Sequence, residues 1–169
     1  MLKTFKLLES HSLLRKTFTI PCDPHGLQLL LGDILSSTIY EQTVKQAEQL
    51  IKHLHHADKQ YQIFKDYQRQ YNSGKEPRAM VAGCRTRWGT ERKCFQRIVE
   101  SELSFLAWSR DSFVQSCFHA SDAKPRTRDV ANTLSDPHFF SQLREILTII
   151  NPIVDEITQA EGDILTSVL

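Results

Sequence analysis

The chain has few cysteines and lacks any long apolar run. Its four cysteines, Cys22, Cys84, Cys94 and Cys117, are scattered over 169 residues, which excludes a disulfide scaffold and fits a reducing compartment. No apolar segment approaches the roughly 18 to 20 residues that cross a bilayer, and residues 1–10 lack the apolar centre of a secretory signal. We therefore expect an intracellular protein, nuclear or cytoplasmic, without a membrane partner.

Neither sign of charge dominates the sequence, because 21 Lys and Arg residues face 20 Asp and Glu residues. This balance excludes a polybasic nucleic-acid coat and an acidic tail protein. The charges nevertheless fall in blocks: residues 75–97 carry seven basic and two acidic groups, and residues 129–169 carry one basic and seven acidic groups. Two interpretations stay open. Either these segments are solvated or pair with each other, or the basic segment contacts a phosphate backbone.

Motifs of common catalytic sites are also missing. The sequence has no Gly-rich phosphate loop, no G-x-S-x-G and no H-E-x-x-H. Cys22 and His25 form a C-x2-H pair, half of a tetrahedral zinc site, but no second pair has the spacing of a structural zinc finger. Packing of Cys22 and a hydrogen bond from His25 explain the pair more simply. We expect no bound metal and no cofactor.

Helical periodicity dominates the pattern that is present. Thr17–Ile20 is β-branched and aromatic and predicts a short strand, and residues 75–90 and 121–128 are predicted to be non-helical. The expected helices run from about Pro24 to Leu35, from a Thr38–Glu41 capping box to Leu54, from Asp58 to Tyr71, from Glu91 to about Cys117, and over 137–150 and 152–168. The pattern predicts a mainly α fold with a short β element at its N-terminal edge.

The basic segment contains Arg85-Thr86-Arg87-Trp88-Gly89-Thr90, a tryptophan flanked by arginines. An exposed tryptophan in such a segment stacks on an unpaired base while the guanidinium groups hold phosphates. A tryptophan packed in the core is the alternative that the spacing leaves open. The residues that we predict to contact DNA are Arg85, Arg87, Trp88, Arg92 and Lys93.

Three motifs, taken in order, resemble a known family: Ile20-Pro-Cys22-Asp-Pro-His25-Gly-Leu-Gln-Leu-Leu-Leu-Gly-Asp33, then Thr86-Arg87-Trp88-Gly89-Thr90, then Phe139-Phe140 leading to Asn151-Pro152 and Glu161. Over residues 17–169 the chain resembles the middle of a hAT-superfamily DNA transposase, whose ribonuclease-H-like catalytic domain is interrupted by a helical insertion. The resemblance implies that residues 1–21 are a short remnant of the ribonuclease-H-like core and that residues 22–169 form the helical insertion domain. It further implies that Trp88 stacks on a flipped base near a DNA hairpin, that Arg87 holds the neighbouring phosphate, and that Cys22 and His25 support this site.

The acids that make this family catalytic do not match the chain. The family binds divalent metal ions such as Mg²⁺ with two Asp that precede the C-x2-H and one Glu that follows the insertion. Residues 1–21 contain no Asp, and no Glu here matches the required context. We therefore expect a catalytically incomplete transposase fragment, with no assigned catalytic residue, that binds DNA through residues 75–97.

Three other possibilities stay open, and the resemblance carries one further implication. The chain could instead be a helical protein-interaction module or a non-functional transposon relic without DNA binding, or an active nuclease. A helical insertion without the sheet on which it packs exposes an apolar face, which predicts self-association.

Overall fold

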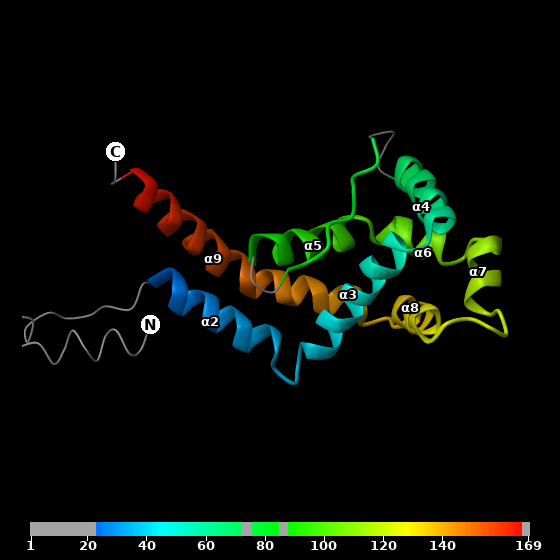
Figure 1. The fold of residues 1–169 in the computed structure, drawn as a ribbon, viewed down its shortest axis with the longest axis horizontal. Helices are drawn as coiled ribbons and strands as arrows, with labels where there is room; N and C mark the ends of the chain where they lie inside the picture. The colour runs from blue at the N-terminus through cyan, green and yellow to red at the C-terminus, as the bar shows by residue number, and fades with distance from the viewer. Residues whose placement is uncertain (1–22, 72–75, 85–87, 167–169) are drawn as a thin grey trace, which may run out of the picture.

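The computed structural model describes residues 23–71, 76–84 and 88–166 (Figure 1). This part of the chain contains eight helices and no β-strand, which confirms the mainly α prediction. The predicted strand Thr17–Ile20 and the proposed core remnant, residues 1–21, lie outside the described residues. The helices are α2 (Asp23–Leu35), α3 (Glu41–His55), α4 (Asp58–Tyr71), α5 (Trp88–Glu100), α6 (Glu102–Trp108), α7 (Ser112–Phe118), α8 (Pro125–Ser135) and α9 (Phe139–Thr166).

The helices form an elongated body with α9 along much of its length (Figure 1). α2 and α9 lie side by side in opposite directions, and α5 also packs on α9. Helices α4, α6, α7 and α8 form the other end of the body, and α3 contacts α8 and α4 as well as α5 and α9. We call α4, α6, α7 and α8 the distal helices. Because α3 contacts two of them as well as α5 and α9, it fixes the position of α5 and α9 relative to the distal helices.

Aromatic side chains hold the distal helices together around Trp108, which is fully buried. The rings of Phe64 and Phe105 are 4.4 Å apart, and Trp108 meets Phe64, Phe105 and Phe118 edge-on. The indole Nε1 donates a hydrogen bond of 2.9 Å to the backbone oxygen of Gln60. The edge-on ring geometry and the indole hydrogen bond fix the relative orientation of these side chains, in addition to the apolar contacts between them.

The first helices follow the sequence prediction, with one correction at a cap. The predicted apolar stripe of α3 is buried: Val44, Ala47, Leu50, Ile51 and Leu54. The predicted Thr38–Glu41 capping box is wrong, because Tyr40 occupies the N-cap position and no side chain caps the helix. Tyr40 also makes a tertiary contact, since its hydroxyl donates a 2.6 Å hydrogen bond to Glu145 of α9.

The predicted long helix from Glu91 to about Cys117 is three helices, and the first of them, α5, begins earlier, at Trp88. The chain turns at Ser101, whose backbone N–H lies 3.2 Å from the oxygens of both Arg97 and Ile98. A second break lies before α7, where an Asp111 carboxylate oxygen accepts hydrogen bonds from the backbone N–H groups of Phe113 and Val114. Asp111 is an N-cap residue that apolar periodicity alone does not reveal.

Two further predictions are corrected in the last third of the chain. Residues 121–128 do not form one polar loop, because α8 begins at Pro125, the residue type that suits the first helical position. The predicted helices 137–150 and 152–168 are one helix, α9, with Pro152 inside it. Proline normally interrupts a helix, but the residues on both sides of Pro152 bury apolar side chains, including Ile150 and Val154, and this packing sustains the helix.

Candidate nucleic-acid interface

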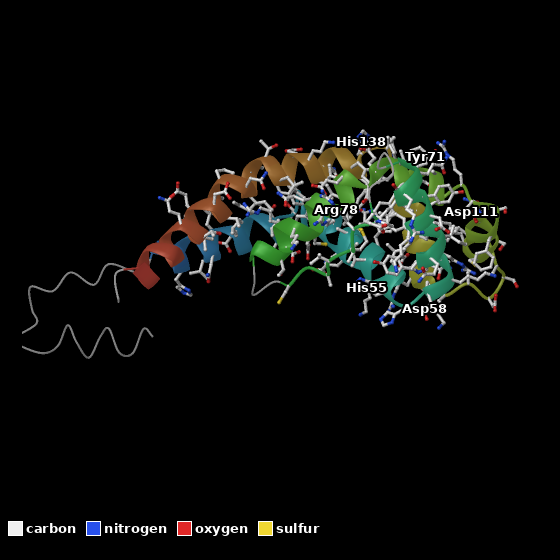
Figure 2. The ribbon with its side chains drawn as sticks, turned by 90° about the horizontal axis from the view of Figure 1, so that it is seen from above. His55, Asp58, Tyr71, Arg78, Asp111 and His138 are labelled. Carbon is white, nitrogen blue, oxygen red and sulfur yellow. The ribbon has the colours of Figure 1, made fainter. Side chains whose placement is uncertain are left out.

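One face of α5 carries three basic residues of the basic segment, Arg92, Lys93 and Arg97. Its polar residues recur at helical spacing and, together with Arg78 from residues 76–84, line a cavity of about 210 Å³. Arg78 is labelled in Figure 2. The lining residues are Arg78, Gly89, Arg92, Lys93, Gln96, Arg97 and Glu100. The cavity therefore brings four cations and one carboxylate onto one surface.

The opposite face of α5 is buried and holds the helix in place. Cys94, Phe95 and Ile98 are fully buried. Glu91 is also buried, and a Cβ atom added at Gly83 would lie 2.4 Å from its carboxylate oxygen, so any larger residue at position 83 would displace the Glu91 side chain. Burial raises the pKa of the Cys94 thiol to about 12, with the Glu91 charge as a further cause.

Three of the four cations at the cavity have acidic partners. Arg92 forms an ion pair with Asp155 of α9, and the guanidinium groups of Arg78 and Arg97 each lie 3.1 Å from the carboxylate of Glu100. The basic and acidic segments thus meet in part, as one of the two charge interpretations predicts. Both carboxylates are more than half exposed, and ion pairs of this kind contribute only about 0–1 kcal/mol, so a phosphate can displace them.

Lys93 differs from its three neighbours. Its side chain is exposed, and within the described residues no ion pair involves it. Four cations against two carboxylates, Glu100 and Asp155, leave the surface with a net positive charge. This surface is suited chemically to phosphate oxygens, which accept charge-assisted hydrogen bonds from guanidinium and ammonium groups.

The predicted site residues are distributed unevenly over the structure. Arg92 and Lys93 lie together on α5 and line the same cavity. Arg85, Arg87 and Cys22 lie outside the described residues, and so does the side chain of Trp88, whose backbone begins α5. His25 is exposed on α2, a helix that packs on α9 rather than contributing to the cavity.

Arg78 and Arg97 also belong to this surface, although the sequence argument did not select them as DNA contacts. Arg97 follows Lys93 by four residues, the spacing that places two side chains on one face of a helix. The helix predicted from Glu91 already contains both residues, so this signal was present in the sequence. Arg78 is brought in by residues 76–84, which have no periodic pattern, so only the tertiary structure places it.

Comparison with protein-family models, with curated proteins and with solved structures yields no match for this chain. In the described residues, no group of three or more His, Cys, Asp or Glu side chains is arranged to hold a metal ion. Among the described helices, none combines the length and apolar character needed to span a membrane.

Proposed function

We propose that this chain binds DNA through the polar face of α5 and that it corresponds to the helical insertion of a hAT-like transposase without the catalytic acids. The observation that carries the DNA-binding proposal is the group of four cations at one cavity, with Lys93 unpaired among the described residues. The three ordered motifs of the sequence support the transposase assignment. Under this proposal the chain contacts DNA and does not cleave it.

Phosphate contacts give this binding a definite dependence on salt. Each phosphate neutralised by Lys or Arg contributes about −0.9 to the slope of log K against log salt concentration. Three or four such contacts reduce the affinity by about 40- to 150-fold when the salt concentration rises fourfold. Fluorescence anisotropy with a labelled DNA hairpin, measured at several salt concentrations, gives this slope directly.

Removing a cation from α5 and freeing another cation of α5 from its acidic partner should change the affinity for DNA in opposite directions. We expect Lys93→Gln to weaken binding and to reduce the salt slope by about 0.9, as loss of one phosphate contact requires. Asp155→Asn releases Arg92 from its ion pair and should strengthen binding. Asp66→Asn is the matched control, because Asp66 is an exposed carboxylate paired with Arg69 on α4, away from the cavity.

Trp88→Ala tests the stacking role that the sequence predicts. A base stacked on an aromatic ring contributes about 1–3 kcal/mol, so we expect about 5- to 150-fold weaker binding to a hairpin with an unpaired base. Fully paired DNA should show a smaller change. If neither Lys93→Gln nor Trp88→Ala alters binding, α5 is not the DNA-binding surface.

A helical protein-interaction module is the second candidate function. Exposed apolar side chains on α2, Leu29 at 59% and Leu30 at 46% exposure, favour this alternative. The Arg92–Asp155 ion pair also agrees with this alternative, because it neutralises one charge of the basic segment within the chain. This candidate predicts no salt-dependent DNA binding by the purified chain, and the same anisotropy experiment distinguishes the two.

A further inference from the structure

A second cavity lies where the end of α3 and the start of α4 meet the beginning of α8. Its volume is about 520 Å³, within the range of pockets that hold small molecules. Residues 53–60 form one wall, and residues 124–127 form the other. The cavity shares no lining residue with the one on α5.

The lining of this cavity is basic and contains no carboxylate. Lys124, Arg126 and His56 are exposed there, alongside Gln60, Thr127 and the buried His53. In the part of the chain that the structure describes, no ion pair joins Lys124, Arg126 or His56 to an acid. No carboxylate among the described residues therefore lies within ion-pair distance of these cations, in contrast to most of the α5 surface.

The backbone of α8 adds to this positive potential. Lys124 is the N-cap residue of this 11-residue helix, and its side chain makes no capping hydrogen bond. Pro125 occupies the first turn and has no N–H group, and the N–H groups of Thr127 and Arg128 bond the backbone oxygen of Lys124, so the backbone N–H of Arg126 is the donor that this helix end offers. The first residues of α8 line the cavity, so the positive end of the helix dipole lies at the same place as the side-chain cations.

The side of the cavity opposite α8 is held by hydrogen bonds. The Nε2 of His53 lies 2.8 Å from the side-chain oxygen of Gln60, and His53 is 6% exposed. The backbone oxygen of Gln60 accepts the indole hydrogen bond of Trp108. This wall is consequently anchored to the aromatic cluster, which keeps the cavity preformed.

We propose that this cavity binds the phosphate group of an organic phosphate, with Lys124, Arg126 and the start of α8 holding the phosphate oxygens. A guanidinium, an ammonium and a helix N-terminus together match the geometry and charge of phosphate. The volume exceeds that of a phosphate ion alone, so an attached organic group has room beside His56 and Ala57. The phosphate is that of a free nucleotide or that of a nucleic-acid strand, and these two sources share the same chemistry.

Isothermal titration of the full chain with inorganic phosphate and with a nucleoside monophosphate tests the proposal, at matched ionic strength. We expect saturable binding that the double variant Lys124→Gln/Arg126→Gln weakens by about 10- to 100-fold or more, the effect of losing charged hydrogen bonds. Both residues are exposed, so the variant should fold, and its circular dichroism checks this. Arg128→Gln is the matched control: Arg128 is on the same helix and bonds the backbone oxygen of Ser121, but it does not line the cavity.

Competition between the two phosphate sources completes the experiment. Tighter binding of the nucleoside monophosphate than of a 5′-phosphorylated oligonucleotide identifies a free nucleotide as the source. The reverse order identifies a strand where the Lys124→Gln/Arg126→Gln variant also loses the oligonucleotide's advantage, because α5 is itself proposed to bind DNA. Because the α5 surface is also suited to phosphate, the double variant is measured in the wild-type and in the Lys93→Gln background; an equal weakening of phosphate binding in both separates this proposal from DNA binding by α5. The proposal is overturned if no saturable phosphate binding occurs, or if the double variant binds as tightly as the Arg128→Gln control.

Discussion

Cys94 and Cys84 lie close in the sequence but have opposite environments, since Cys94 is buried in α5 and Cys84 is exposed. With the pKa of Cys94 raised to about 12, only about one molecule in ten thousand carries its reactive thiolate at pH 8. We therefore expect a thiol reagent to label Cys84 in the folded protein and Cys94 only after unfolding. Peptide mass mapping at several denaturant concentrations measures this. Labelling of Cys94 as fast as Cys84 in native buffer would contradict the packing of α5.

His53 predicts how stability responds to mild acid. Burial lowers the pKa of this imidazole below its ordinary value of 6.5, with the nearby charge of Arg126 acting in the same direction and the Gln60 hydrogen bond opposing both. The unfolded chain therefore takes up the proton first as the pH falls below about 6.5, and the free energy of unfolding decreases. We expect His53→Gln to reduce this pH dependence. Thermal unfolding between pH 7 and pH 5 is the measurement, and His119→Gln, at an exposed histidine, is the control. If stability changes equally with pH in the wild type and in His53→Gln, the prediction is refuted.

At the scale of elements, α9 carries a proline where helices normally stop. Pro152 is exposed and has no N–H to donate to the backbone oxygen of Thr148, four residues earlier. We expect Pro152→Ala to raise the free energy of unfolding by about 1–3 kcal/mol, because it restores helix propensity and one hydrogen bond. Urea denaturation measures the change. Thr158→Ala, at an exposed position of the same helix, controls for the general gain in stability from alanine. If Pro152→Ala instead lowers the free energy of unfolding, the packing of α9 on α2 and α5 needs the proline.

Local capping chemistry explains which element boundaries the sequence could predict. The end of α4 at Tyr71, just before Asn72-Ser73-Gly74, agrees with the predicted break. The breaks at Ser101 and Asp111 were missed because apolar residues continue at near-helical spacing through both. Helix α8 was missed for the opposite reason, since its first residues are polar and only Val130, Thr133 and Leu134 are buried. Tertiary packing supplies the stabilisation that these short helices lack on their own.

At the scale of the whole molecule, the exposed leucines of α2 predict self-association. Leu29 and Leu30 lie on the helix that packs along α9, and because each is already about half buried, covering it with a second copy is favourable by about 1 kcal/mol. We expect sedimentation velocity to show a concentration-dependent dimer or larger species. Leu29→Lys/Leu30→Lys should return the chain to a monomer, whereas Leu103→Lys, an exposed apolar position on α6, is the control for a general gain in solubility. A wild-type chain that remains monomeric at all concentrations would contradict this prediction.

The basic surface of α5 could be predicted in part from the sequence. The charge block, and Arg92 and Lys93 within it, could be identified because charges adjacent in sequence remain adjacent on a helix. The cavity of Lys124 and Arg126 could not, because its two walls come from residues about 70 positions apart and include histidines with no motif spacing.

The sequence by itself determined the mainly helical class, the apolar stripe of α3 and the separation of basic from acidic segments, because each depends on residues a few positions apart. Only the tertiary structure decided that α9 continues through Pro152, that Arg92 meets Asp155, and that Arg78 joins the α5 surface. These features depend on contacts between distant segments, where packing against a neighbouring helix outweighs the local preference of any single residue.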